Sequence, residues 1–142
     1  VLESNVSRNL GNGVWLLGSD GCTILDNTIA ENGLYGIAIE SGCTNNTIYG
    51  NVLSMNGDGN ALDTCGGNAW DDGVGLGNTW NPYDGRDAYL IPGDGHAVDN
   101  FPRPLRPCAP ELVALVVATV VTLLTVPTLL IGIRRETESA PV

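Results

Sequence analysis

Apolar residues in the first 65 positions occur in short runs separated by Asn and Gly, without the three- and four-residue spacing of a helix. Asn9, Asn32 and Asn56 hold equivalent places in three successive units, at steps of 23 and 24 residues. The aligned apolar runs are Val14–Leu16, Ile37–Ile39 and the weaker Ala61–Leu62. A fixed period in the twenties predicts a solenoid of stacked units.

Each unit predicts one coil of short β-strands joined by tight turns, because its alternating runs are brief and bounded by Asn or Gly. A leucine-rich repeat has a similar period, but it needs several leucines per unit, and Asn and Gly recur here instead. We therefore predict an all-β fold, a parallel β-helix, over residues 1–65. Its coils would stack at about 4.8 Å, with equivalent residues directly above one another.

The recurring asparagines predict corner positions of this helix. Asn tolerates the left-handed backbone of a sharp turn and bonds to nearby backbone groups. Stacked amide side chains also hydrogen-bond to one another along an axis, as in cross-β assemblies. We therefore expect Asn9, Asn32 and Asn56 to form a ladder at one corner, with left-handed backbone at the asparagines themselves.

The C-terminal part of the sequence has a different pattern. The 22 residues from Leu112 to Ile133 carry no charge. As a helix they would span roughly 33 Å, enough to cross the hydrocarbon core of a bilayer. Pro127 would kink such a helix without excluding it. A buried core helix is the alternative, but the domain is too small to bury a helix that is apolar all round. We predict a transmembrane helix over residues 112–133 and a short tail over 134–142.

The orientation of the predicted span in the membrane is indicated by the basic residues near it and by glycosylation sequons in the repeats. Arg134 and Arg135 follow the span directly, and basic residues prefer the cytoplasmic side; Arg103 and Arg106 lie farther from its other end. The sequons begin at Asn5 and Asn45, although Asn and Thr are common in these repeats. We expect a single-pass protein of the cell membrane, with its repeats outside. The alternative is a C-terminal sorting signal, whose apolar part is removed and replaced by a lipid.

The net charge of −10 and the absence of Lys argue against a nucleic-acid partner, because phosphate binding requires a basic surface. An acidic surface without Lys is also typical of proteins that stay soluble in concentrated salt, as in a halophilic archaeon. Residue 1 is Val and no signal-peptide pattern precedes the repeats. Because an uncapped first coil would leave an open sheet edge, we expect further coils upstream.

The period is lost in residues 66–100, a closing segment rich in Trp and Asp, and residues 101–111 form a Pro-rich spacer. We expect Trp70, Trp80 and Tyr83 to cover the open end of the last coil. The phrases NNTIYGN and GNTWNPYDGRDAYLIPGDGHAVDNFPRPL resemble the NosD-type right-handed parallel β-helix family, over roughly Ser4 to Leu105. Its terminal motif matches Gly77, Asn78, Trp80, Tyr83, Gly85 and Asp87, then Asp99 and Pro102.

The resemblance implies a parallel β-helix fold but fixes no single function, because its members include proteins of copper-site maturation, surface proteins and relatives of polysaccharide-processing enzymes. Copper prefers clusters of Cys, Met or His. The chain offers His96, Met55 and four cysteines without a close ligand motif, so we predict no metal site.

The cysteines are at positions 22, 43, 65 and 108, and the first three recur at nearly the coil period. Stacked coils bring Cα atoms to about 4.8 Å, inside the range that a disulfide accepts. A Cys22–Cys43 disulfide is the preferred pair if the domain is extracellular. Buried free thiols, which act as small apolar residues, are the alternative.

No catalytic residue is predicted. Sugar-cleaving β-helices use clustered or paired carboxylates, whereas the acidic residues here lie in the closing segment and not at repeated coil positions: Asp71, Asp72, Asp84, Asp87, Asp94 and Asp99. This segment has oxygen ligands suited to Ca²⁺ but lacks the spacing of an EF-hand loop. We expect acidic turns, and no cofactor other than a weak Ca²⁺ ion.

Strand alternation places Trp15 and Tyr49 on the outside of the coils, where aromatic rings could stack on sugars. The favoured interpretation is a non-catalytic carbohydrate-binding or scaffold module of the cell surface, with polysaccharide or envelope components as partners. One alternative is the tail of a polysaccharide lyase or hydrolase with its active site in upstream coils. The other is a periplasmic copper-maturation protein.

Overall fold

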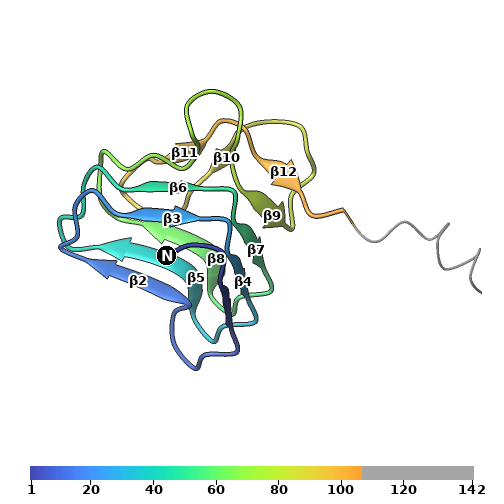
Figure 1. Cartoon of the computed structure of the whole chain (residues 1–142), viewed down its shortest axis with the longest axis horizontal. Coiled ribbons are helices and arrows are strands. Elements are labelled where there is room, and N and C mark those ends of the chain that lie inside the picture. The colour runs from blue at the N-terminus through green and yellow to red at the C-terminus, as the bar shows by residue number, and fades with distance from the viewer. Residues whose placement is uncertain (107–142) are drawn as a thin grey trace, which may run out of the picture. The chain divides into compact units, whose positions relative to one another are not determined.

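The structure, a computed structural model, describes residues 1–106, which form short β-strands and turns (Figure 1). The all-β parallel solenoid predicted from the repeats is confirmed for this part, with about four turns. No helix in residues 1–106 is long and apolar enough to cross a membrane. The predicted span at 112–133 and the tail at 134–142 lie outside the described residues, as does part of the spacer.

Three parallel sheets form the sides of the solenoid, and a small antiparallel hairpin lies near its C-terminal end. The longest sheet contains β1 (Asn5–Ser7), β4 (Thr28–Ala30), β7 (Val52–Ser54), β9 (Thr79–Asn81) and β12 (Arg103–Pro104). The second contains β2 (Val14–Leu17), β5 (Tyr35–Glu40) and β8 (Gly59–Asp63), and the third β3 (Thr23–Leu25) and β6 (Thr47–Tyr49). The hairpin pairs β10 (Tyr89–Leu90) with β11 (Val98–Asp99).

The register shows why the sequence period folds into coils. Val14 pairs with Ile37, and Ile37 with Ala61, so the three apolar runs of the sequence stack in one sheet. In the longest sheet, Ile29 pairs with Leu53, which pairs with Trp80. The first two coils each contribute one strand to each of the three sheets, and the third contributes β7 and β8 to the two longer sheets. The pairing between coils satisfies the backbone of neighbouring strands.

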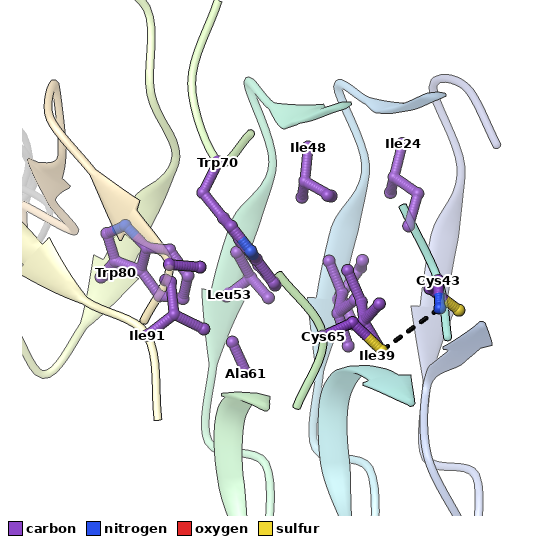
Figure 2. Close-up of a cluster of buried hydrophobic side chains, with 13 residues drawn as sticks. Ile24, Ile39, Cys43, Ile48, Leu53, Ala61, Cys65, Trp70, Trp80 and Ile91 are labelled. Carbon is purple, nitrogen blue, oxygen red and sulfur yellow. Dashed lines mark hydrogen bonds between the residues drawn. The ribbon is translucent and has the colours of Figure 1, made fainter. Parts of the chain in front are cut away.

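The core is a column of side chains that point inward from the three sheets (Figure 2). Ile24, Ile48 and Trp70 follow one another from coil to coil and are buried. A fully buried Ile contributes about 1.5–3 kcal/mol relative to an exposed one. Because each coil contributes only a few such side chains, the stack depends on several coils for a continuous core.

Left-handed backbone occurs at the corners, but one residue earlier than predicted. Asn9, Asn32 and Asn56 do not have positive φ; the residues before them do, with φ of 59° at Arg8, 56° at Glu31 and 54° at Met55. The prediction that the asparagines adopt this backbone was therefore wrong. The preceding residue makes the sharp turn, which leaves the Asn side chain free to point at the next coil.

Met55 allows this corner strain to be measured. Its side chain is 63% exposed, so its packing contributes little. A non-Gly residue in left-handed backbone costs roughly 1–2 kcal/mol, and β-branched residues tolerate it worst. We expect Met55→Val to lower the free energy of unfolding by about 1 kcal/mol, and Met55→Gly to leave it unchanged or raise it. Urea unfolding checks this; equal stability of the two variants would contradict a strained corner.

The closing segment covers the C-terminal end of the β2–β5–β8 sheet. The Asp63 N–H donates to the Pro92 carbonyl at 2.8 Å, and the Gly95 N–H donates to the Asp63 carbonyl at 3.0 Å. Residues 92–95 thereby satisfy the backbone of Asp63, the last residue of β8, without continuing the strand. Trp80 stacks on Tyr89 of the hairpin, with ring centroids 4.0 Å apart and planes inclined by 7°.

Candidate functional site

Asn9, Asn32 and Asn56 form a hydrogen-bonded column at one corner. The Asn9 side-chain amide donates to Asn32 Oδ1 at 2.9 Å, and the Asn32 amide donates to Asn56 Oδ1 at the same distance. Each Oδ1 also accepts the backbone N–H of the asparagine above it, at 3.1 Å. The Asn56 amide continues to Asn60 Oδ1 at 3.0 Å. The amides thus join consecutive coils along the axis.

Two further columns exist that the sequence reasoning missed. Asn27, Asn51 and Asn78 form one, with amide-to-Oδ1 distances of 2.9 Å. Asn46 and Asn68 form the other, also at 2.9 Å. The signal for the first was present in the sequence, because these asparagines begin the similar phrases NTI, NVL and NTW. All three corners of the coils are therefore built alike.

Buried aspartates stand at the C-terminal ends of two of these columns. The Asn78 backbone N–H donates to Asp99 Oδ2 at 2.7 Å, and the Asn68 amide lies 3.2 Å from both Asp63 oxygens. An Asn at the end of a column would carry N–H groups without an acceptor beyond it, whereas a carboxylate only accepts. Asp99 and Asp63 therefore end the columns without leaving a buried donor unpaired.

Tryptophan indoles complete both carboxylate sites. The Trp80 Nε1–H donates to Asp99 Oδ2, and the Trp70 Nε1–H donates to Asp63 Oδ2, each at 2.9 Å. Asp99, Asp63 and both tryptophans have no exposed surface. The Phe101 N–H donates to Asp99 Oδ1 at 3.0 Å. The Cys65 N–H donates to Asp63 Oδ1 at 2.9 Å. These oxygens hold the fold together and face no solvent from which a substrate could approach.

Asp71 and Asp72 fix the loop between the last two coils. Asp71 Oδ2 accepts the backbone and side-chain N–H groups of Asn100 at 2.9 and 2.8 Å. Asp72 Oδ1 accepts three consecutive backbone N–H groups, from Val74, Gly75 and Leu76. Both carboxylates therefore have structural partners.

The surroundings shift the acidities of Asp99 and Asp72 in opposite directions. Burial raises the pKa of Asp99, and this outweighs the lowering by its N–H donors. The backbone N–H groups of Leu76 and Val74 lower the pKa of Asp72. The Asp99 contribution to stability is present at low pH and is lost as pH rises through its folded-state pKa. The Asp72 contribution is present at higher pH and is lost as pH falls through its folded-state pKa.

We therefore expect opposite pH trends from two single variants. As pH rises through the carboxyl range, the stability advantage of the wild type over Asp99→Asn should shrink, and its advantage over Asp72→Asn should grow. Urea unfolding at a series of pH values measures both differences, and the unchanged carboxylates cancel in each comparison. Trends of the same sign would contradict the assigned environments.

The terminal motif lies mainly in the closing segment. Asn78, Trp80 and Asp99 are the buried cluster described above, and Gly77 lies where a Cβ would overlap the Asp99 carboxylate. The Tyr83 hydroxyl donates to the Asp87 carbonyl, and its ring meets Tyr89 edge-on at 6.0 Å. Gly85 has φ of 81°, a left-handed turn. Pro102 precedes β12. The motif residues thus build the closed end.

Trp15 and Tyr49 are not brought together. Trp15 lies on β2 and is 56% exposed, whereas Tyr49 lies at the end of β6 in another sheet and is partly buried. The Trp15 Nε1–H donates to Glu40 Oε2 of the neighbouring coil at 2.7 Å. Ala38, which pairs with Trp15, is only 1% exposed. The indole therefore leans over β5 and covers Ala38, with part of its surface open to solvent.

The register does not support the Cys22–Cys43 pair. Cys22, Cys43 and Cys65 are free thiols, and the Cys22 N–H donates to Asn46 Oδ1 of the next coil. Cys43 lies level with Ser19 and Cys65, at separations of 24 and 22 residues. The 21-residue spacing of Cys22 and Cys43 falls short of one coil at this corner, so they occupy different columns. Cys108 lies outside the described residues.

Potential ion and glycan sites are few in the described part. No group of three or more His, Cys, Asp or Glu residues within 1–106 is arranged to hold a metal ion. Asp84 lies 3.7 Å from the Arg86 guanidinium, which competes with any cation there. Asp87, Asp94 and His96 are exposed. Asn5 and Asn45, the sequon asparagines, are exposed, and the Asn45 amide donates to Asp20 at 3.0 Å.

Parallel coils, amide columns at the corners and a closed C-terminal end define a parallel β-helix repeat protein. Residues 1–85 match the family described as "Periplasmic copper-binding protein (NosD)", and the chain belongs to this family. The comparisons with curated proteins and with solved structures gave no match.

Proposed function

We propose that this chain is a β-helix module of the cell envelope that binds a neutral polysaccharide on the outer face of the β2–β5–β8 sheet and catalyses no reaction itself. Family membership supports the location, because the family description places its proteins in the periplasm. The single observation that carries the binding proposal is the Trp15 indole, held on an outer sheet face by Glu40.

Trp15 has the features of a sugar-stacking residue. Its ring is large, apolar and accessible, and the bond to Glu40 Oε2 fixes its orientation before a ligand arrives. A pre-oriented group loses less conformational entropy when it binds. The open part of the ring would contact the C–H face of a sugar, while Glu40 could accept sugar hydroxyls beside it.

The negative charge of the chain favours a neutral polysaccharide over an acidic one. The chain carries a net charge of −10, and Glu40 lies directly at the proposed surface. An acidic polymer would be repelled, especially at low ionic strength. A neutral polymer with free hydroxyls fits the surface better than a polyuronate.

Copper is the second candidate because the family description names it. The described residues do not fit copper. Met55 and His96 are exposed at separate places, and Cys43 and Cys65 are buried within a hydrogen-bonded column. Soft metal ions need clustered soft ligands, so we derive no chemistry from copper.

The binding proposal predicts a specific mutational effect. Titration of dextran, a neutral glucan, into the protein ending before Leu112 should give binding, and polygalacturonate should give none. Trp15→Ala should weaken dextran binding about tenfold, which corresponds to about 1.4 kcal/mol. Leu90→Ala is the control, because it removes an exposed apolar side chain from β10, outside the proposed binding face, and it should change affinity less than twofold. Equal losses in both variants would contradict the proposed role of Trp15.

A further inference from the structure

Cys43 and Cys65 occupy adjacent levels of one column in consecutive coils. The Cys43 N–H donates to Cys65 Sγ at 3.2 Å, as the dashed line in Figure 2 shows. The flanking chain has the same 22-residue offset, because the Asn45 N–H donates to the Gly67 carbonyl at 3.0 Å and Thr47 bridges to Ala69. The two cysteines are therefore register partners.

We propose that Cys43 and Cys65 are a modification site, where a small-molecule or protein disulfide oxidises the thiol pair to a disulfide between coils. Register partners of adjacent parallel strands have Cα atoms about 4.8 Å apart, within the range of about 4.4–6.8 Å that disulfides accept. The bond would join two coils along the axis, next to the buried Asp63 carboxylate, which accepts the Cys65 N–H. This proposal does not depend on polysaccharide binding.

Two exchange steps form the bond. Cys65, which is 6% exposed while Cys43 is fully buried, reacts first. Its thiol loses a proton, and the thiolate attacks the oxidant's disulfide, giving a mixed disulfide and releasing one thiolate. Cys43 then loses its proton and attacks Cys65 Sγ, releasing the second thiolate. The protein loses two protons and two electrons, and the oxidant is reduced to two thiols.

The partial exposure of the hydrogen-bond partners of Cys43 limits the cost of this change. In the reduced state its S–H donates to the Glu40 carbonyl at 3.0 Å, and its Sγ accepts the Ser19 N–H at 3.2 Å. Rotation toward Cys65 breaks both bonds. Ser19 and Glu40 are at least partly exposed, so water can replace the lost partners. Cys22 has no such register partner, because Asn46 lies opposite it.

The test identifies which cysteine thiols are converted to a disulfide under oxidising conditions. The full chain carrying Cys108→Ser, in detergent, is incubated with oxidised glutathione, quenched in acid, denatured and alkylated before mass spectrometry of its peptides. We expect Cys43 and Cys65 to be linked and Cys22 to be alkylated. A Cys22–Cys43 link, or three alkylated thiols under oxidising conditions, would overturn the proposal. Cys22, Cys43 and Cys65 are all unchanged in this protein, so the readout does not depend on replacing any of the thiols that it follows.

A second measurement tests the structural consequence. Dithiothreitol should lower the Tm of the oxidised protein, and it should not change the Tm of Cys65→Ser. In Cys22→Ser the shift should remain as large as in the parent. A dithiothreitol effect that survives Cys65→Ser, or that disappears in Cys22→Ser, would show that another pair carries the disulfide.

Discussion

Replacing Asn51 by alanine is expected to lower the free energy of unfolding by about 4 kcal/mol, because several buried polar groups lose their partners at once. Asn51 is fully buried. Its Oδ1 accepts the backbone and side-chain N–H groups of Asn27 at 3.0 and 2.9 Å. Its amide donates to the carbonyls of Ile24 and Tyr49 and to Asn78 Oδ1.

Asn5→Ala is the matched control for this prediction. Asn5 lies on β1 and is exposed. Its replacement should change stability by less than about 0.5 kcal/mol, as is usual for surface positions. Urea unfolding followed by circular dichroism compares both variants with the wild type. A loss below about 1 kcal/mol for Asn51→Ala, the value of one ordinary hydrogen bond, would mean that the amide columns do not hold the coils together.

Gly57→Ala is expected to cost about 3 kcal/mol, because the added methyl group would overlap the backbone of the preceding coil. A Cβ at position 57 would overlap the Gly33 carbonyl oxygen and lie 3.0 Å from its carbon. Gly33 stands in the same relation to Leu10. The obstacle is backbone, which cannot rotate away as a flexible side chain can.

Gly11→Ala is the control for Gly57→Ala, because a methyl group at position 11 overlaps no other atom. A Cβ at position 11 meets nothing within 4 Å, and Gly11 does not have left-handed φ. Its replacement should be neutral or raise stability by up to about 1 kcal/mol, because alanine lowers the conformational entropy of the unfolded chain. Thermal unfolding of both variants under one set of conditions measures the difference. Equal Tm values would contradict the tight coil stacking after each corner asparagine.

The repeat pattern was enough to predict the coils, because every coil repeats the same alternation of inward and outward side chains. Val14, Ile37 and Ala61 align in the sequence and pair in the sheet. The corners were harder to predict, because the left-handed positions carry residues such as Arg8, Glu31 and Met55, which no turn preference identifies. Their conformation is imposed by coil stacking, which sequence propensity does not report.

Two features of the site could not be predicted from the repeat period, because they depend on which residues of neighbouring coils lie opposite one another. The offset between equivalent residues is 24 from Ser19 to Cys43 but 22 from Cys43 to Cys65, so near-periodic cysteines need not share a column. The acidic residues of the closing segment were expected to form surface turns. Asp99 instead ends an amide column inside the protein, as does Asp63 of β8, on which the sequence analysis made no prediction. These roles appear only when the indoles and amides around the two carboxylates are placed.

The burial of these aspartates bears on function. Carboxylates that act on glycosidic bonds must reach the substrate, whereas Asp63 and Asp99 are enclosed by N–H donors. Trp15, by contrast, is exposed on an outer sheet face. Asp63 and Asp99 therefore have structural roles, whereas the Trp15 ring is accessible, as the proposed polysaccharide binding requires.

Size-exclusion chromatography of the protein mixed with dextran tests the central claim most directly, because one run reports both polymer length and protein binding. We predict that the protein elutes with dextran of unchanged size, and that Trp15→Ala elutes separately while Leu90→Ala, altered outside the proposed binding face, still elutes with the polymer. Shortened dextran would contradict the claim of a non-catalytic module and would identify a polysaccharide-processing enzyme. Separate elution of protein and intact dextran would contradict neutral polysaccharide as its ligand.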